Sequence, residues 1–418
     1  MQSTQTYSLN IKTYHTKATS PETTLIVVIP CYNEPHLLNS LQSLYKNHPT
    51  KGKVEVITVI NSSENVLPNI KQQNNQTLQD ALQWTSSLKS SFIHFSFIEA
   101  TEIPEKIAGV GMARKIGMDE AYKKLDSIKN NEGVIVCFDA DATCAENYLS
   151  IIENHFNNHP KTTGCSIYFE HPIAGNDFSA SIYKGIIQYE LHLRYHKEAL
   201  AFAGLPFAYH TVGSSMAVRA NIYHKQGGMN KRKAGEDFYF LQKVIPLGNF
   251  SEINNTVVYP SPRVSDRVPF GTGKAMGSWL ENKSEQLNSY HFSSFLDLKI
   301  LVNNAEQFYF SDEVNLPDSI TSYLKSIDFQ ENLEKIRRNA TNKSHFVSLF
   351  FKWFNAFKVL KYLHFSRDNF YGEQPINQAA NLLLNTLEIN TSHDVDELLL
   401  TYRKLQLKQI KPYQHAKA

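Results

Sequence analysis

The amino-acid sequence predicts an α/β fold of the Rossmann-like type, in which a mostly parallel sheet carries helices on both faces and a C-terminal helical extension follows. Over roughly the first 170 residues, short apolar and β-branched runs alternate with helical patterns, which is typical of a parallel sheet covered on both sides. From about residue 278 onward, helical patterns follow one another without strand patterns between them. A chain of 418 residues also suits one large domain plus an extension.

Five short apolar runs predict the first strands, because each is rich in β-branched residues or bounded by turn residues. They cover 25–29, 54–60, 92–98, 134–138 and 165–169. The stretches between them predict helices over 35–45, 77–88, 112–128 and 145–155. Sheets of this kind bind ligands at the carboxyl ends of their strands. We therefore expect the segments 30–34, 61–63 and 139–141 to lie close together.

The rest of the chain predicts three further kinds of element. A long amphipathic helix is expected over 180–200, strands over 214–218 and 256–259, short helices over 221–226 and 237–244, and a basic loop over 260–277. The C-terminal helices are expected over 292–308, 320–338, 345–365, 378–387 and 394–409. This pattern divides the chain into a polar N-terminal segment (1–22), an α/β domain (23–277) and a helical extension (278–418).

Composition and termini exclude several classes of protein. The formal net charge is +2, so bulk charge gives no reason to expect nucleic-acid binding. Residues 1–20 lack the apolar stretch of a signal peptide, and no window reaches the roughly 18 uncharged apolar residues of a membrane span. No two of the four cysteines have CxxC spacing, which favours reduced thiols. We therefore expect a cytoplasmic protein.

The strongest chemical signal is a pair of acids, Asp139 and Asp141, that directly follows the expected strand 134–138. In an extended segment, residues i and i+2 share a face, so both carboxylates could address one cation. Mg²⁺ and Mn²⁺ bind carboxylate oxygens together with the oxygens of a diphosphate. The alternative is a solvated loop or the N-cap of the helix that we expect to follow.

A second signal comes after the first strand, where Pro30, Tyr32, Asn33 and Glu34 open the first helix. A helix N-terminus attracts anions and offers free backbone N–H groups, and the two polar side chains could hydrogen-bond a base or a ribose. The alternative is a plain capping turn with a proline at the first helical position. Asn61 ends the second strand and is expected at the same edge.

These segments resemble the inverting family 2 glycosyltransferases with the GT-A fold. The family pattern is a strand, then Pro-x-x-Asn-Glu, a second strand, a Gly/Ala-Arg helix start and an Asp-x-Asp; here the helix start corresponds to 109–117, Gly-Val-Gly-Met-Ala-Arg-Lys-Ile-Gly. The resemblance covers roughly 24–273 and makes that part a GT-A domain. It implies that Arg114 contacts the nucleotide or its phosphates. The alternative is a surface arginine that pairs with Asp119 or Glu120.

The resemblance continues at the Gly-Glu-Asp sequence of 235–237, which follows a small-residue strand and a Gly-Gly turn. It implies that Asp237, next to Glu236, is the base that takes the proton of an acceptor hydroxyl. A carboxylate within hydrogen-bonding reach can do this. The alternative is an acid placed at a helix N-terminus because the helix dipole favours it there.

A basic loop contains Arg263 and Arg267 together with glycines. Arginine suits bidentate contact with phosphate, and a loop that closes over a diphosphate excludes water. A solvated basic loop is the alternative. The loop lacks the Gln-x-x-Arg-Trp sequence of processive members of the family.

Two other departures concern the ligands. Many family members have an aspartate after the second strand, where this chain has Asn61, and this leaves the donor nucleotide open. A third protein ligand to the metal is not evident, and His210 is a candidate by residue type alone. The aromatic segment 345–365 suits core packing of a helical subdomain or, with its lysines at the interface, peripheral docking at the inner face of the membrane.

The resemblance implies a hexosyltransferase-type enzyme that uses Mg²⁺ or Mn²⁺. It would transfer a sugar, with inversion, from a nucleotide-sugar donor to a hydroxyl of a glycan, a lipid-linked acceptor or a small molecule. Two alternatives remain at this point: a nucleotidyltransferase, and a non-catalytic relative that binds sugar nucleotides. A nucleotidyltransferase would usually show a glycine-rich phosphate loop after the first strand, and the segment 30–34 has none.

Overall fold

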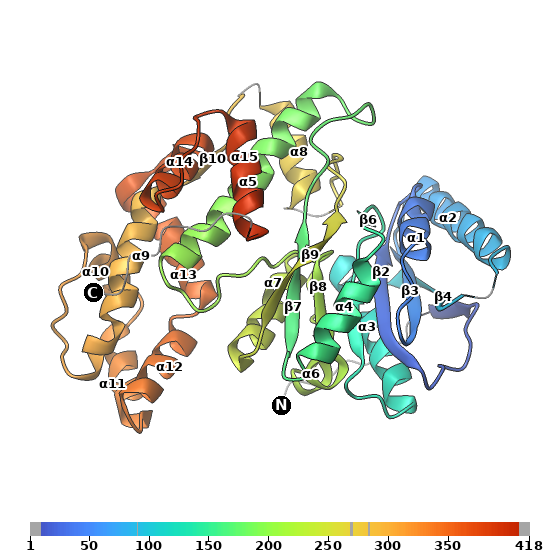
Figure 1. The fold of residues 1–418 in the computed structure, drawn as a ribbon, viewed down its shortest axis with the longest axis horizontal. Coiled ribbons are helices and arrows are strands. Elements are labelled where there is room, and N and C mark those ends of the chain that lie inside the picture. The colour runs from blue at the N-terminus through green and yellow to red at the C-terminus, as the bar shows by residue number, and fades with distance from the viewer. Residues whose placement is uncertain (1–9, 90, 268–270, 283–284, 409–418) are drawn as a thin grey trace. The chain divides into compact units, whose positions relative to one another are not determined.

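The structure is a computed structural model that describes residues 10–89, 91–267, 271–282 and 285–408. The chain divides into two compact units (Figure 1). The first comprises Met1–Pro172 and Thr211–Lys274, and the second comprises Ile173–His210 and Ala275–Ala418. The predicted boundaries at 22/23 and 277/278 stay predictions.

The first unit is built on a mixed sheet of nine strands among the described residues, in the order β1-β4-β3-β2-β5-β8-β7-β9-β6. Strands β2, β3, β4 and β5 pair in parallel at its centre. β7 and β9 run in the same direction as these four, whereas β1, β6 and β8 run against them. The strands are β1 (Asn10–Tyr14), β2 (Thr23–Cys31), β3 (Lys53–Ser63), β4 (Ile93–Ile103), β5 (Val134–Cys137), β6 (Thr143–Cys144), β7 (Gly164–Phe169), β8 (Met216–Arg219) and β9 (Ser251–Tyr259).

The central strands are buried on both faces, which explains their continuous apolar sequences. The run 25–29 in β2 is at most 1% exposed at each position. Val27 lies opposite Val56 of β3 on one side and Val136 of β5 on the other. Because β2 and β5 are parallel neighbours, the segments that follow them leave the sheet at the same edge.

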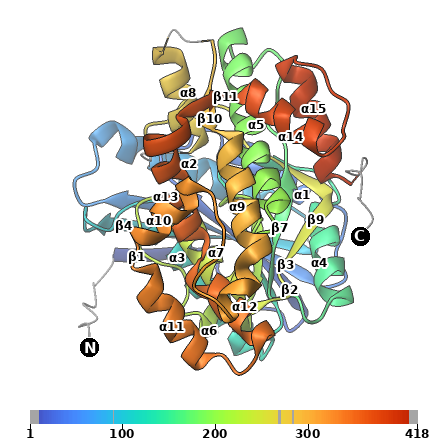
Figure 2. The same cartoon turned by 90° about the vertical axis from the view of Figure 1, so that its left-hand side faces the viewer.

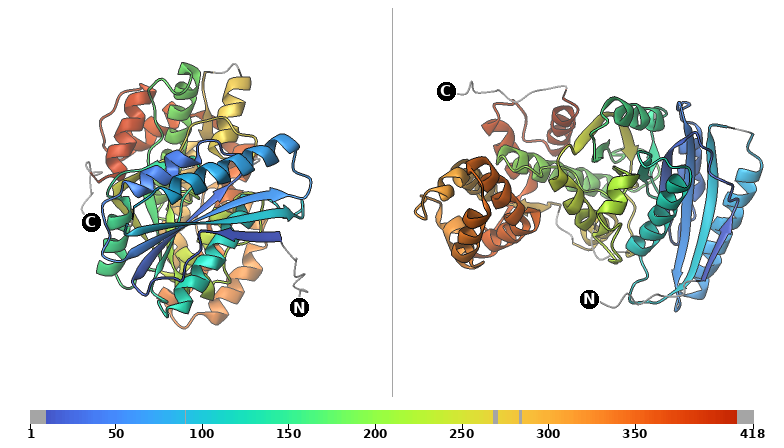
Figure 3. Two further views of the ribbon diagram at one scale, coloured as in Figure 1. Left: turned by 90° about the vertical axis from the view of Figure 1, so that its right-hand side faces the viewer. Right: turned by 90° about the horizontal axis from the view of Figure 1, so that it is seen from below.

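Helices cover both faces of this sheet (Figure 3). They are α1 (Leu37–Tyr45), α2 (Pro68–Ser86), α3 (Val110–Ser127), α4 (Tyr148–Asn158), α6 (Ala220–Lys225) and α7 (Glu236–Val244), with a 3-10 turn η1 (Ile245–Leu247). α3 packs closely on β2 and β3, since a Cβ atom at Gly117 would lie 2.4 Å from a methyl group of Val28. This close approach holds the middle of α3 against the sheet.

The structure corrects several predicted elements of the first unit. The segment 10–14, predicted as part of a polar N-terminal segment, forms edge strand β1 against β4. β3 continues through 61–63 and β4 through Ile103, and α2 begins at Pro68 instead of 77. The loop predicted over 260–277 ends in helix α8 (Thr272–Glu281). β1 was missed because its residues are largely exposed, so that they carry no alternation of apolar and polar residues.

The second unit is helical among its described residues (Figure 2). It contains α5 (Ala180–Phe202), the last part of α8, α9 (Phe292–Asn304), η2 (Ala305–Tyr309), α10 (Asp318–Lys325), α11 (Phe329–Asn339), α12 (Lys343–Trp353), α13 (Ala356–Ser366), η3 (Arg367–Tyr371), α14 (Ile376–Thr386) and α15 (Val395–Gln406). A short two-stranded sheet pairs β10 (Asn288–Tyr290) with β11 (Glu373–Pro375). α5 packs against α9, α14 and α15.

Two predicted long helices of this unit are each broken into two. The stretch 320–338 breaks before Asp328, which has a left-handed backbone with φ of 50°. The stretch 345–365 breaks at Asn355, whose side chain caps α13 by accepting a hydrogen bond from the amide of Lys358. Turn and cap residues thus ended helices whose apolar periodicity continued across the break.

The aromatic residues of 345–365 contribute to the core of the second unit. Phe346, Phe350 and Phe354 are 0% exposed, and the ring of Phe350 contacts those of Phe308 and Phe329. Core packing therefore accounts for these rings. In the described ranges, no helix is both long enough and apolar enough to cross a membrane. The predicted fold class, α/β with a C-terminal helical region, is confirmed.

Candidate functional site

The candidate site lies within the first unit, where loops leave the carboxyl ends of the parallel strands. Glu34 follows β2, Asp139 and Asp141 follow β5, and Arg114 lies in the first turns of α3, which follows β4. Glu236 opens α7. The ion pairs described below join these segments, so the structure brings together side chains that the sequence places up to about two hundred residues apart.

The acidic pair lies in a tight turn and not in an extended segment. The amide of Ala142 donates to the carbonyl of Asp139 at 3.1 Å, closing the turn. The hydroxyl of Ser40 in α1 donates to the carbonyl of Ala140 at 2.7 Å. The next helix, α4, begins only at Tyr148, so neither acid caps it and the N-cap alternative is wrong. The turn is thus held from the first helix of the domain.

Arg114 joins Asp139 to Glu236. Its Nη2 lies 2.7 Å from Oδ1 of Asp139, and its Nη1 lies 3.1 Å from Oε1 of Glu236. The arginine is 1% exposed and Glu236 is 3% exposed. The alternative of a surface arginine paired with Asp119 is wrong, because Lys115 makes that pair at 2.9 Å. Arg114 therefore spans the segments that follow β5 and that begin α7.

A second ion-pair network joins Asp141 to Glu34. Nε of Arg263 lies 2.8 Å from Oδ2 of Asp141, and its Nη2 contacts Oε2 of Glu34. Arg267 lies 3.2 Å from Asp141 and also donates to the backbone carbonyl of Tyr32 at 2.8 Å. The predicted basic loop is thus folded onto the segment after β2. In this arrangement its two arginines form ion pairs with the carboxylates of Glu34 and Asp141.

The segments after β2 and β3 are linked by Asn74 of α2. Its Oδ1 accepts from the amide of Asn33 at 2.8 Å, and its Nδ2 donates to the carbonyl of Asn61 at 3.2 Å. Asn33 has a left-handed backbone with φ of 50°, which asparagine tolerates better than most residues. Pro30 lies buried at the end of β2. These contacts hold Asn33, which follows β2, close to Asn61, which lies among the last residues of β3 and not after it.

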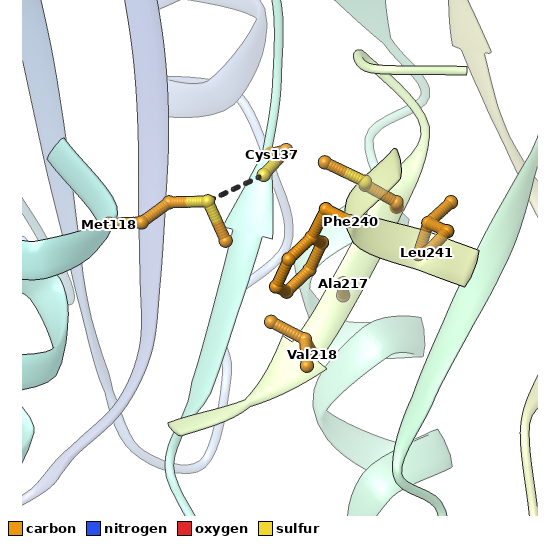
Figure 4. Close-up of a pocket in the computed structure, with 7 residues that line it drawn as sticks. Met118, Cys137, Ala217, Val218, Phe240 and Leu241 are labelled. Carbon is orange, nitrogen blue, oxygen red and sulfur yellow. Dashed lines mark hydrogen bonds between the residues drawn. The ribbon is translucent and has the colours of Figure 1, made fainter. Parts of the chain in front are cut away.

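Helix α7 is anchored by an apolar cluster beside its acidic start (Figure 4). Phe240 and Leu241 of α7, Met118 of α3 and Cys137 of β5 together line a small apolar pocket that has no room for water. The thiol of Cys137 lies 3.7 Å from the sulfur of Met118. Asp237 accepts a hydrogen bond from the amide of Phe238 at 2.7 Å. The packing fixes where α7 presents its first two residues.

Burial dominates the electrostatics of the acids. It raises the pKa of Asp139 to about 6 and that of Glu236 to about 7, while the charge of Arg114 opposes both shifts. Burial also raises the pKa of Asp237, again against Arg114. In the second network, burial raises the pKa of Glu34 and Arg263 lowers it. Carboxyl groups perturbed in this way and gathered at one edge of a sheet make this place a candidate functional site.

The eight side chains of the site are unequal in charge. Five are acids and three are arginines, so the net formal charge of the group is −2. The residues are Glu34, Asp139, Asp141, Glu236, Asp237, Arg114, Arg263 and Arg267. This group of charged side chains is called the acidic site below. Its excess of negative charge, in a partly buried setting, favours binding of a cation.

The donor set of the acidic site fits a hard divalent cation. Oδ2 of Asp139 and Oδ1 of Asp141 accept no hydrogen bond from any described residue. Within the described ranges, no three His, Cys, Asp or Glu side chains converge closely enough to hold an ion by themselves. Mg²⁺ typically takes one or two carboxylates and completes its shell with phosphate and water. His210, considered above as a third metal ligand by its residue type, belongs to the second unit, and its Nε2 lies 3.1 Å from Oε1 of Gln406.

Sequence reasoning did not identify three residues that shape the site. Ser40 and Asn74 hold the loops, and Gly213 leaves room for the guanidinium of Arg114: a Cβ atom there would lie 2.2 Å from its Nη1. Single polar residues in helices give no distinctive sequence signal. The glycine could have been suspected, because it interrupts a small-residue strand segment just before β8.

Solved structures of GT-A glycosyltransferases match the chain over most of its length. S. aureus TarS 1–349 in complex with UDP-GlcNAc is 16% identical, with a TM-score of 0.40, over 70% of this chain and 77% of that chain. The mannosyltransferase PcManGT from Pyrobaculum calidifontis, in complex with GDP-Man and Mn²⁺, is 13% identical, with a TM-score of 0.38, over 94% and 88%. No family model and no curated protein sequence matches the chain.

Proposed function

We propose that the chain is a metal-dependent glycosyltransferase that moves a sugar from a nucleotide-diphosphate sugar to an acceptor hydroxyl. One observation carries the proposal: the acidic turn after β5 and the acidic start of α7 are joined by one buried arginine, Arg114. A transfer reaction needs a cation site for the diphosphate and a base for the acceptor at a short distance from each other. The acidic site combines residues suited to both tasks.

Asp139 and Asp141 would hold the metal, because each keeps a carboxylate oxygen that accepts no hydrogen bond from a described residue. A bound divalent ion would neutralise charge on the leaving diphosphate. Arg263 and Arg267 pair with Asp141 in the structure. We propose that they turn to the phosphates when a donor binds, because the guanidinium group matches phosphate in a bidentate manner.

The nucleotide would lie along the segments after β2 and β3. Asn61 lies at the end of β3 and is 3% exposed, and its side-chain amide would offer a donor and an acceptor to a base. Tyr32 and Asn33 are partly exposed beside it. Pro30 and Glu34 are buried and would shape this pocket from behind. Glu34 holds Arg263, which suits a role in placing the loop.

Asp237 would act as the base. A carboxylate oxygen of Asp237 takes the proton of the acceptor hydroxyl as the hydroxyl oxygen bonds to the anomeric carbon. The bond between that carbon and the diphosphate oxygen breaks at the same time, and its electron pair leaves with the nucleoside diphosphate. In-line attack of this kind inverts the anomeric configuration. Burial raises the pKa of Asp237, which makes it a better proton acceptor than an exposed aspartate.

The experiment is thermal unfolding with a panel of UDP- and GDP-sugars, each with and without Mn²⁺. A ligand that binds the folded state raises the free energy of unfolding by mass action, by about 2.7 kcal/mol at 100 times its Kd, and the unfolding temperature rises with it. We expect a metal-dependent rise with one of these donors. It should be absent in the double variant Asp139→Asn/Asp141→Asn. The matched control is Asp80→Asn/Asp126→Asn, which removes the same charge elsewhere on the first unit.

Product analysis then separates the possible activities. Slow metal-dependent hydrolysis to free sugar and nucleoside diphosphate supports a glycosyltransferase. Release of a sugar phosphate with a nucleoside triphosphate, on addition of pyrophosphate, would identify a nucleotidyltransferase instead. Binding without any turnover, with glycan, lipid-linked and small-molecule acceptors all present, would indicate a non-catalytic binding protein. An equal thermal shift in the double aspartate variant would remove the metal assignment.

A further inference from the structure

Arg114 occupies a position that no nucleotide can reach without rearrangement. It is 1% exposed, and its guanidinium lies between Asp139 and Glu236 at 2.7 and 3.1 Å. Both carboxylates belong to the acidic site but come from different segments. Asp139 lies in the turn after β5, and Glu236 lies at the start of α7. The arginine thus contacts acids on both sides and lies out of reach of solvent.

Two glycines leave the space that this arrangement needs. A Cβ atom at Gly213 would lie 2.2 Å from Nη1 and 2.9 Å from Nη2 of Arg114. A Cβ atom at Gly111, one turn before the arginine, would lie 2.0 Å from the carbonyl oxygen of Arg232 and 3.1 Å from Cβ of Glu236. A larger residue at either position would displace the guanidinium or the start of α7. The backbone around Arg114 therefore restricts it to this one placement.

The hydrogen bonding of Arg114 differs from that of a structural arginine in the same unit. Arg219 is also buried, and its Nε, Nη1 and Nη2 donate to the carbonyls of Thr162, Glu132 and Phe156 at 2.8, 2.9 and 2.8 Å. Nε of Arg114 is buried without a hydrogen bond to any described residue, and Nη1 meets Glu236 at 3.1 Å as an ion pair without hydrogen-bond geometry. Buried donors without partners are costly and uncommon. A residue that served packing alone would be expected to satisfy its donors as Arg219 does.

We propose that Arg114 is a positioning residue, which fixes the metal-side carboxylate Asp139 relative to the base-side pair of Glu236 and Asp237. The inference rests on the proposed function and replaces direct nucleotide contact as the role of this arginine. A planar guanidinium can hold two carboxylates at a set separation, which a lysine ammonium cannot do. The acceptor hydroxyl must meet the anomeric carbon at a short distance, so this separation governs the rate more than the binding.

The test compares steady-state kinetics and donor binding of Arg114→Lys with those of Arg219→Lys. We expect Arg114→Lys to lower kcat about 100-fold, because misplacement of roughly 1 Å costs this much. The KM for the donor, and the Kd for the nucleoside diphosphate with Mn²⁺ measured by calorimetry, should change less than about three-fold. Arg219→Lys should leave kcat unchanged and lower only the unfolding temperature. A rise in donor KM and Kd at unchanged kcat would overturn the inference in favour of nucleotide contact.

A double-variant cycle with Glu236→Gln supplies the second readout. If Arg114 acts through Glu236, the combination Arg114→Lys/Glu236→Gln should be no slower than the slower single variant, because residues that act as a unit are not additive. Multiplied losses would overturn the inference. Wild-type chain that neither binds nor turns over any sugar nucleotide would remove the proposed function itself. Normal wild-type turnover with multiplied losses would remove the role of Arg114 alone, so the two failures are distinguishable.

Discussion

The two units each contain a buried cluster of arginines and carboxylates, and the clusters are built differently. In the second unit, Glu190 accepts from Nε of Arg194 at 2.8 Å and from Nε and Nη2 of Arg403 at 2.8 and 2.9 Å. Both oxygens of this carboxylate are used, and the cluster ties α5 to α15. In the first unit, the acidic site carries more acids than arginines, and Nε of Arg114 is buried without a hydrogen bond to any described residue.

Buried arginines and carboxylates can therefore stabilise a fold in one place and form a candidate binding site in another. A buried ion pair is tolerated when its geometry is good and further hydrogen bonds satisfy its atoms, and the Glu190 cluster meets this condition. The acidic site leaves charge and donors unmatched, which is costly for the ligand-free protein and useful for binding a cation and an anion together.

The largest effect is expected for Asp237→Asn, which keeps the size of the side chain but removes its ability to accept a proton. We expect kcat for sugar transfer to fall by about 100- to 10,000-fold, the range of general base catalysis. Donor binding with Mn²⁺, measured by calorimetry, should remain. Retention of wild-type kcat would mean that the acidic start of α7 is structural, like the Glu190 cluster.

The second prediction concerns stability. Glu190→Gln leaves two buried arginines without their carboxylate, and breaking a buried pair in this way costs about 3–5 kcal/mol of unfolding free energy. Urea unfolding would measure it. The matched loss of charge in the first unit, Glu236→Gln, should leave stability at neutral pH unchanged or higher, because burial already raises the pKa of Glu236 to about 7. Equal losses in the two variants would remove the contrast between the clusters.

Two glycine variants separate packing from function. Gly213→Ala brings a Cβ atom to 2.2 Å from Arg114, and Gly185→Ala brings one to 2.6 Å from the ring of Trp279 in the second unit. Each overpacks its site and should lower stability by about 1–3 kcal/mol. Only Gly213→Ala should also reduce kcat, since it displaces the guanidinium. A similar loss of kcat in Gly185→Ala would show that lowered stability alone impairs activity.

The smallest effects are expected in the dependence of stability on pH, where the two units should respond in opposite directions. Burial lowers the pKa of His192 to about 4 and that of His196 to about 3. The unfolded chain takes up protons on these rings as the pH falls through 6.5, whereas the folded chain does so only at about 4 for His192 and about 3 for His196, so their contribution to stability is lost as the pH falls from 6.5 to these values. His196→Leu should make the unfolding free energy fall less steeply over that range.

Glu236 should act with the opposite sign. Its pKa in the folded chain is raised to about 7 from an ordinary value of 4.5, so the folded chain binds the proton more tightly and this group favours folding as the pH falls from 7 toward 4.5. Glu236→Gln should therefore make the loss of stability in acid steeper. Measurement of urea midpoints from pH 7.5 to 4.5 would check both variants. Slopes that change in the same direction would contradict the comparison.

Much of the fold of the first unit could be predicted from the sequence. Periodicity identified the central strands and most helices, because buried parallel strands are apolar throughout and helices repeat with their own period. The strand ends then predicted which segments would meet, and Glu34, Asp139 and Asp141 do meet at the edge of the sheet. Edge strand β1 and the helix breaks at 326–328 and 354–355 were not predicted, because exposed strands and local caps leave little periodic signal in the sequence.

The ion-pair partners within the acidic site follow from the folded structure and could not be predicted from the sequence. Nothing in the local sequence of Arg114 indicates that Asp139 and Glu236 bracket it, or that Gly213 leaves it room, since these residues belong to four separate segments of the chain. Patterns along a sequence report local geometry, whereas burial and the pairing of charges depend on which segments the packing of the sheet and its helices brings together. The chemistry was therefore suggested by residue type, and the arrangement of the charges was set by the fold.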